Sequence, residues 1–184
     1  MIKPNNFDNV QALGGYTPIE LGGHILIIKE VVEYRNPKGT RMAKISYDTH
    51  ETDKQPKYYS DQWKKDSSKA DRIWRGVFLQ VIENSNGLAN VGFVTFIKSI
   101  EASNPGFIFN WDEKTLAGKL VGATFGRQEY EKDGESKFTT KLFLFNPIDV
   151  IKKGVKVPAD KLLSGSSYNN SDLIPVNNGG DLPF

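Results

Sequence analysis

Cationic and aromatic side chains alternate within one polar stretch, residues 54–75, and they are the residues best suited to chemistry. The stretch holds seven Lys and Arg against three Asp, together with two Tyr and two Trp. Ammonium and guanidinium groups pair with phosphates, and each aromatic ring that stacks on a base contributes about 1–3 kcal/mol. The candidates are Lys57, Tyr58, Tyr59, Trp63, Lys64, Lys65, Arg72, Trp74 and Arg75. Such a set predicts a contact surface for a polyanion that carries flat rings.

Two other segments carry secondary candidates of the same kind. They are Arg41, Lys44 and Tyr47 in one segment, and Arg127, Tyr130 and Lys141 in the other. The apolar run around Trp74 also suits a core residue, so its ring is either a platform or part of the core. Trp111 stands beside Asp112 and Glu113. This acidic setting leads us to interpret Trp111 as a packing residue.

Most catalytic chemistries lack their residues in this chain. There is no Cys, there are only two His, and no Gly-x-x-x-x-Gly-Lys-Ser/Thr loop occurs. The sequence therefore excludes thiolate chemistry and nucleotide hydrolysis by a P-loop. The segment from Asp48 to Asp53 alternates acids with His50 and could hold Mg²⁺ or Zn²⁺, although a charged strand end or turn explains it better. We expect a protein that is not an enzyme and has no metal or cofactor; a metal-dependent nuclease is the enzymatic alternative.

Alternation and turn residues predict the elements that must position these side chains. Residues 24–34 are rich in Ile and Val, residues 41–50 alternate, and an Asn-Pro-Lys-Gly turn lies between them, which indicates a hairpin. The basic and aromatic stretch then forms a long loop with a short helix near residues 60–69. Residues 73–82 form a third strand or a helix, since Gly76 weakens both.

The second half of the chain predicts a helix and another hairpin. Apolar residues at helical spacing, with Asn90 as the N-cap, indicate a helix over residues 91–103. Residues 120–131 and 136–146 alternate around an Asp-Gly pair, which is a strong hairpin signal. A short turn of helix follows over residues 147–153.

Five strands with one helix between the third and the fourth follow the order of an OB-fold, a partly open Greek-key barrel that binds oligonucleotides or oligosaccharides. We predict a mainly β, OB-fold-like domain over residues 23–160, an N-terminal arm over 1–22 and a flexible tail over 161–184. Another small α+β domain is the alternative. No apolar run reaches the roughly 20 residues of a membrane helix, and the start lacks the apolar core of a signal peptide. A cytoplasmic protein is therefore expected.

The tail differs from the body in charge and composition. All 24 Lys and Arg lie at or before Lys161, whereas residues 162–184 carry two acids and no base. Eleven of the 21 residues from Ser164 onward are Ser, Asn or Gly, which predicts disorder. The chain nevertheless ends in Asp181, Leu182, Pro183 and Phe184. A terminal aromatic ring for an apolar pocket, and carboxylates for cations, predict a tethered peptide that binds a partner protein.

This ending resembles the C-terminal tip of bacterial single-stranded-DNA-binding proteins, in which acidic residues precede Ile-Pro-Phe after a Gly/Ser/Asn linker. It departs from that tip in having Leu182 in place of the isoleucine and a single acid. Residues 107–112, 118–126 and 130–138 resemble proteins encoded by phages and integrative elements of Gram-positive bacteria. The resemblance implies an OB-fold that holds single-stranded DNA and a tip that docks on replication, recombination and repair proteins of a bacterial host.

The residues and the resemblance together predict a protein that binds and protects single-stranded DNA and recruits other proteins through its tip. The alternative is a protein-interaction OB module without DNA affinity, such as a phage adaptor, which does not require the cationic and aromatic stretch. The Ile- and Val-rich first strand could also supply an interface for a homo-oligomer.

Overall fold

A single five-stranded sheet dominates the described part of the chain. The structure is a computed structural model that describes residues 17–66, 70 and 72–163. The predicted tail from residue 164 onward, its tip, and the first 16 residues of the predicted arm lie outside the described residues. Within the described part, no helix combines the length and the apolar character needed to cross a membrane.

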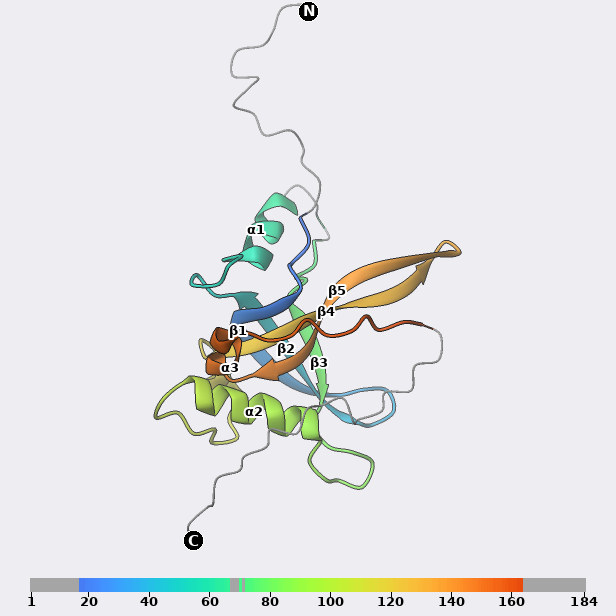
Figure 1. Cartoon of the computed structure of the whole chain (residues 1–184). Coiled ribbons are helices and arrows are strands. Elements are labelled where there is room, and N and C mark those ends of the chain that lie inside the picture. The colour runs from blue at the N-terminus through green and yellow to red at the C-terminus, as the bar shows by residue number, and fades with distance from the viewer. Residues whose placement is uncertain (1–16, 67–69, 71, 164–184) are drawn as a thin grey trace, which may run out of the picture.

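The sheet order matches the predicted fold. The strands are β1 (Gly22–Arg35), β2 (Arg41–Thr49), β3 (Val77–Val81), β4 (Leu120–Lys132) and β5 (Glu135–Asn146). The helices are α1 (Tyr58–Lys65), α2 (Val91–Ser103), the 3-10 helix η2 (Glu113–Leu116) and α3 (Ile148–Lys153). Every neighbouring pair is antiparallel, in the order β3-β2-β1-β4-β5 (Figure 1). The prediction of a mainly β, OB-fold-like sheet with a helix between the third and fourth strands is confirmed.

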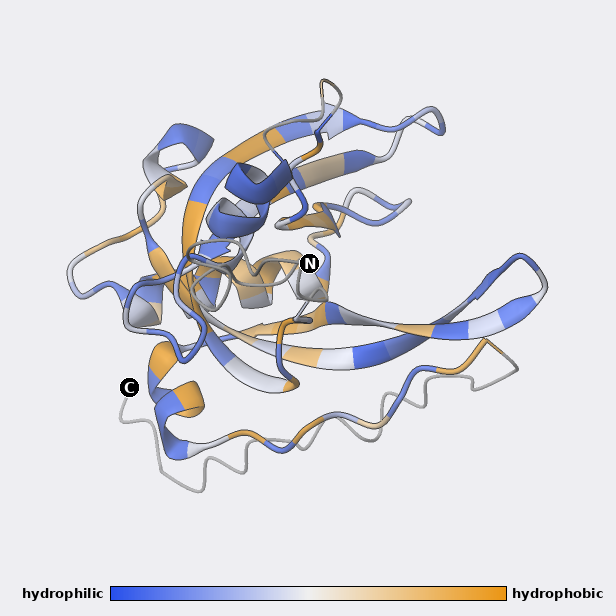
Figure 2. Cartoon of the chain, turned by 90° about the horizontal axis from the view of Figure 1, so that it is seen from above, coloured by the Kyte–Doolittle hydropathy of each residue, from blue (hydrophilic) through white to orange (hydrophobic). Residues whose placement is uncertain are grey.

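The sheet curls until its two edge strands approach one another (Figure 2). The ring of Phe78 on β3 lies 5.4 Å from the ring of Phe145 on β5, in an edge-to-face arrangement. Phe96 of α2 lies 4.7 Å from the same Phe145 ring. Side chains therefore join β3, β5 and α2 although β3 and β5 are not neighbours in the hydrogen-bonded order, which leaves the barrel partly open.

A β-bulge in β1 decides which residues of that strand face outward. Leu26 and Ile28 are fully buried, and the register with β2 shifts between Ile28 and Glu30. The bulge leaves Lys29 and Glu30 exposed in succession, and Val31 resumes the buried series. An extra residue of this kind re-aims the side chains that follow it. Two charged side chains consequently stand next to each other on the outer face of the sheet.

The helix predicted over residues 91–103 has these limits in the structure. The side-chain oxygen of Asn90 accepts a hydrogen bond from the backbone nitrogen of Gly92 at 2.9 Å, as an N-cap does. Phe93, Phe96 and Ile100 are buried against the sheet. The helical spacing of apolar residues thus located the core face of α2 correctly.

The segment predicted as a third strand or a helix is a strand, but it starts at Val77 instead of residue 73. A Cβ atom on Gly76 would lie 2.1 Å from the backbone oxygen of Tyr47. This close approach lets the Tyr47 nitrogen donate a hydrogen bond to the Gly76 oxygen at 2.8 Å. Gly76 therefore fastens the irregular entry to β3 onto β2.

The predicted Asp-Gly hairpin is also present, and it projects away from the barrel (Figure 1). Asp133 and Gly134 both have left-handed φ values, 58° and 76°, as the tightest hairpin turns require. The free edge of β4 is covered by the end of the described chain, where the Lys161 nitrogen donates to the Arg127 oxygen at 2.9 Å. The boundary predicted at residue 160 thus falls within a segment that is bound to β4.

Candidate nucleic-acid interface

Helix α1 carries part of the predicted binding stretch and is fixed to the end of β2 by one buried carboxylate. Asp48 accepts hydrogen bonds from the backbone nitrogens of Thr49 and Tyr59, each at 2.9 Å, and from the hydroxyl of Ser60. The Thr49 hydroxyl accepts a further bond from the Tyr58 nitrogen at 2.9 Å. The first turn of α1 is therefore held by β2 side chains, which sets the position of Trp63 one turn later.

Three of the predicted residues form one cluster between the last turn of α1 and the segment that leads into β3. The guanidinium carbon of Arg72 lies 4.2 Å from the centroid of the Trp63 ring, and an Arg72 nitrogen donates to the Trp63 backbone oxygen at 3.3 Å. The rings of Trp63 and Trp74 lie 6.1 Å apart. Trp74 donates through its indole nitrogen to the Gly76 oxygen at 3.1 Å, so its ring is held at the start of β3. Cation and rings are thus gathered at one end of the sheet.

An open depression of about 410 Å³ lies between this cluster and the outer face of the sheet. Its lining residues are Lys29, Glu30, Lys44, Ser46, Ser60 and Trp74. Within the described part of the chain, neither the two lysine ammonium groups nor the carboxylate of Glu30 forms a hydrogen bond or an ion pair. These charged groups are therefore available to a ligand.

Below the depression, the outer face of β1, β2 and β3 carries apolar side chains around Lys44. Residues paired directly across strands point to the same face. The register aligns Val32, Lys44 and Leu79 in one row across the three strands. The next row is Tyr34, Met42 and Val81. Val32 and Leu79 are exposed, so the face combines a cation with contact surface for bases and sugars.

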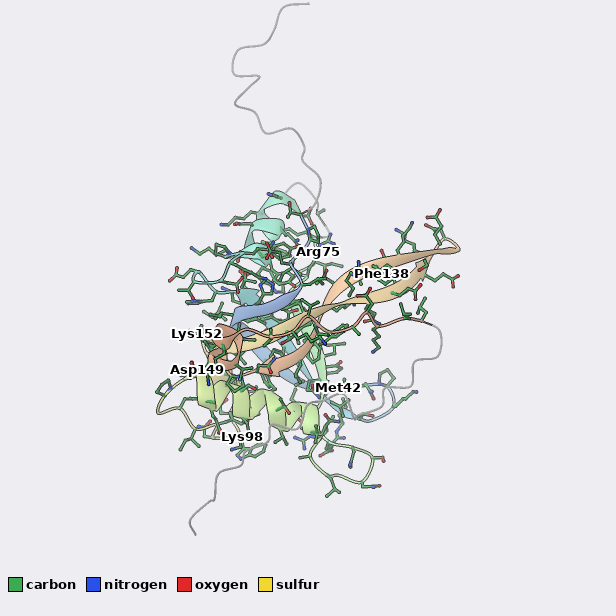
Figure 3. The ribbon with its side chains drawn as sticks, viewed as in Figure 1. Met42, Arg75, Lys98, Phe138, Asp149 and Lys152 are labelled. Carbon is green, nitrogen blue, oxygen red and sulfur yellow. The ribbon has the colours of Figure 1, made fainter. Side chains whose placement is uncertain are left out.

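Figure 3 labels Arg75 near α1 and Met42 near the opposite end of the sheet. Arg75 stands near α1, where one of its nitrogens lies 3.4 Å from an Asp66 carboxylate oxygen. Met42 is the second residue of β2 and therefore lies at the end of the strand that is farther from α1. The face therefore extends along the whole length of β2 and β3.

Two predicted stacking residues, Tyr47 and Tyr59, are wrong as surface platforms. They are only 3 % and 7 % exposed, and their rings meet edge to face at 5.3 Å inside the core. Burial raises the pKa of Tyr47 to about 12. The reason is that Tyr47 lies on the inward face of β2 and Tyr59 on the sheet side of α1. Tyr58 is half-buried and donates through its hydroxyl to the Thr17 oxygen at 3.0 Å, so it ties down the start of the described chain.

Arg41, predicted as a secondary contact, is engaged by two acids of its own chain. Its Nε lies 2.8 Å from a Glu33 oxygen, and its Nη1 lies 2.9 Å from a Glu83 oxygen. These hydrogen bonds, that to Glu33 foremost, raise the pKa of Arg41. The residue links β1, β2 and the chain after β3. A phosphate would have to compete with these two carboxylates for the guanidinium group.

Arg127 is likewise engaged, in its case by Asp160. Its guanidinium also lies 5.1 Å from the Phe138 ring on β5. Tyr130 and Lys141 are exposed on the projecting hairpin, which Phe138 marks in Figure 3. These three predicted residues therefore lie apart from the depression.

The remaining predicted cations are Lys57, directly before α1, and two lysines at the end of that helix. Lys57, Lys64 and Lys65 are exposed, and Lys64 has a carboxylate oxygen of Asp61 at 3.5 Å. The structure thus brings together Lys44, Trp63, Arg72 and Trp74, with the α1 lysines nearby on the chain. Sequence reasoning missed Lys29, Tyr34 and Leu79. Alternation within β2 and β3 hinted at a shared outer face, but no local signal revealed the bulge that exposes Lys29.

The interpretation of Trp111 as a packing residue is wrong. Its side chain is 79 % exposed, and the neighbouring Ile108 is 80 % exposed. The backbone of Trp111 has a φ of 67°, in the left-handed region that non-glycine residues rarely adopt. Asp112 caps η2 directly after it by accepting a bond from the Lys114 nitrogen at 3.1 Å. The loop therefore presents an indole ring to solvent.

The acids of the segment from Asp48 to Asp53 point to different partners. Asp48 caps α1, whereas Asp53 lies 2.9 Å from Nδ1 of the fully buried His24. Burial alone would raise the pKa of Asp53, but hydrogen bonds from His24 and from two backbone nitrogens together hold it below its ordinary value. Among the described residues, no three His, Asp or Glu side chains gather as metal ligands would.

No protein-family model matches the sequence, and a search of curated proteins also gives no match.

Proposed function

We propose that this protein binds single-stranded DNA along the outer face of β1, β2 and β3. The observation that carries the proposal is the convergence of Trp63, Arg72 and Trp74 beside a depression that contains two unpaired lysines. Binding of an unpaired strand requires cations that follow its phosphates and surfaces on which its bases stack. The OB-like sheet supplies both on one face.

The geometry supports different contacts with the strand at different points along this face. Trp63 and Trp74 offer rings at the α1 end, Lys29 and Lys44 offer cations at the centre, and Tyr34 offers a further ring toward the other end. A flexible strand can place phosphates on the lysines and bases on the rings, and neither of these contacts depends on the identity of the base. The proposed protein therefore covers single-stranded DNA of mixed sequence.

The C-terminal tip, residues 181–184, supplies the second half of the proposal. It combines Asp181, Pro183 and a terminal Phe184, and it follows a Gly/Ser/Asn-rich linker. An anchoring ring with a neighbouring carboxylate suits a basic pocket on another protein. We propose that the tip recruits replication, recombination or repair proteins of a bacterial host to the bound DNA.

A gel shift with a labelled oligo-dT of about 35 nucleotides tests DNA binding directly. We expect the protein to retard the oligonucleotide at about 50 mM salt and to do so less as the salt concentration rises, because phosphate contacts release counterions. We also expect tryptophan emission to change on binding, because the rings lie at the proposed site. A strand that is not retarded at low salt would refute the proposal. Double-stranded DNA of equal length is the control for unspecific attraction.

A protein-interaction module without DNA affinity is a second candidate, and Trp111 is the observation that favours it. Trp is one of the residues enriched at the hot spots of protein interfaces. Trp111 and Ile108 stand exposed on the loop that precedes η2, separate in sequence from the face described above. Absence of oligo-dT binding in the gel shift, with partner capture that requires Trp111, would establish this candidate over the first.

A further inference from the structure

A carboxylate lies inside the proposed DNA-binding depression, where a purely phosphate-binding groove would not place one. Glu30 is exposed directly after the bulge in β1, and it lines the depression together with Lys29 and Lys44. Its cross-strand neighbour on the same face is Ser46. A phosphate at this point would be repelled by Glu30 as well as attracted by the lysines, so the presence of Glu30 points to a hydrogen-bond donor in the ligand.

The surroundings of Glu30 resemble a binding site for the edge of a base. No described residue neutralises its carboxylate, and neither lysine of the depression forms an ion pair with it. Trp74 forms part of the wall, and the hydroxyl of Ser46 and the ammonium of Lys44 can donate to ring nitrogens and carbonyls of a base. A volume of about 410 Å³ is ample for a single base.

We infer that Glu30 is a specificity-determining residue, which accepts a hydrogen bond from the exocyclic amino group of a base held against Trp74. Cytosine presents such a group at N4, whereas uracil and thymine present a carbonyl oxygen at the same position. A carboxylate attracts the amino group and repels the carbonyl. The depression therefore favours cytosine over uracil or thymine at one position of the bound strand. This inference rests on the proposed function.

Oligo-dC and oligo-dU of equal length are the probes, since they differ at this edge of the base and carry no methyl group. Anisotropy titrations at neutral pH should show that the native protein binds oligo-dC roughly fivefold or more tightly, as expected for one specific base contact. Glu30→Gln should reduce this ratio to near one. It should raise the affinity for oligo-dU, because it removes a negative charge from the proposed phosphate-binding face and the repulsion of the carbonyl, whereas oligo-dC loses its contact with the carboxylate.

Glu131→Gln is the matched control, because Glu131 is exposed on the projecting hairpin and its substitution removes the same charge elsewhere. It should leave the ratio unchanged, and thermal melting should show that both variants fold. Equal affinity of the native protein for the two strands, or an unchanged ratio in Glu30→Gln, would overturn the inference while leaving the proposed function intact. Failure of both strands to bind would overturn the proposed function, and the inference with it.

Discussion

The guanidinium carbon of Arg72 lies 4.2 Å from the centroid of the Trp63 ring. The arrangement joins helix α1 to the segment that leads into β3, and it places a cation directly on an aromatic platform. A cation over the face of an aromatic ring is attracted by the ring quadrupole, so Arg72 and Trp63 hold one another in place. This pair lies at the α1 end of the proposed interface.

Trp63→Ala should weaken oligo-dT binding by about 1 kcal/mol or more, because a stacking platform and the support of Arg72 are lost together. Fluorescence anisotropy with a labelled oligo measures the change. Trp111→Ala is the matched control, since Trp111 is more exposed but lies on the loop before η2. An equal loss in both variants would show that the effect does not come from this site.

Tyr59→Ala should act on stability instead of binding. The ring is 7 % exposed and meets Tyr47 edge to face, so its removal leaves a cavity under α1. Truncation of a buried aromatic side chain costs about 3–5 kcal/mol. Urea denaturation should show a loss of this order. If the variant keeps the stability of the native protein but no longer binds DNA, Tyr59 belongs to the binding interface and the prediction is wrong.

Lys44→Ala and Lys29→Ala should each flatten the salt dependence of DNA binding. Each lost phosphate contact on a single strand reduces the slope of log affinity against log salt by about 0.7. Titrations at several salt concentrations measure the slope. Lys98→Ala is the control, because Lys98 lies on α2 (Figure 3). Its ammonium group is paired with Glu101. Unaltered slopes in both depression variants would argue against phosphate contacts there.

The His24–Asp53 pair should make stability depend on pH in the acid range. The pKa of Asp53 lies below its ordinary value, so its contribution is fully present above the unfolded pKa of about 3.9 and disappears as pH falls through the folded pKa. Asp53→Asn should lower the free energy of unfolding by about 1–3 kcal/mol at neutral pH, because a buried hydrogen-bond network is broken. The difference in the free energy of unfolding between the native protein and Asp53→Asn should become smaller below about pH 3.9.

Denaturation series over this pH range provide the measurement for Asp53. His50→Ala serves as a comparison, because His50 contacts Thr52 near the surface. If the difference in the free energy of unfolding between the native protein and Asp53→Asn stays constant down to about pH 2, the role assigned to the carboxylate is contradicted.

Deletion of residues 181–184 should leave DNA affinity intact or slightly raise it, because the deletion removes negative charge and no part of the described face. The same deletion should abolish capture of host replication and repair proteins on an affinity column. Asp181→Asn with the rest of the tip retained tests the carboxylate alone. Retention of every partner by the truncated protein would show that the tip is not the recruiting element.

Signals that span a few residues gave a correct outline of the elements. The Asp-Gly turn, the Asn90 cap and the apolar spacing of residues 91–103 each report a local backbone preference, and all three appear in the structure as predicted. The order of strands and helix along the chain was then enough for the OB-like topology, because few sheet arrangements accommodate that order.

Tertiary structure decided which of the candidate residues share the proposed binding face. Tyr47 and Tyr59 share the residue types of a stacking site, yet the pleat of β2 and the packing of α1 turn both into the core. Conversely, Lys29 and Glu30 reach the outer face only because a bulge interrupts the alternation of β1. Residue types and local preference are properties of a short segment and can be deduced from it. The direction of a side chain depends on register, bulges and partners that are distant in the sequence, and these exist only after the sheet has closed.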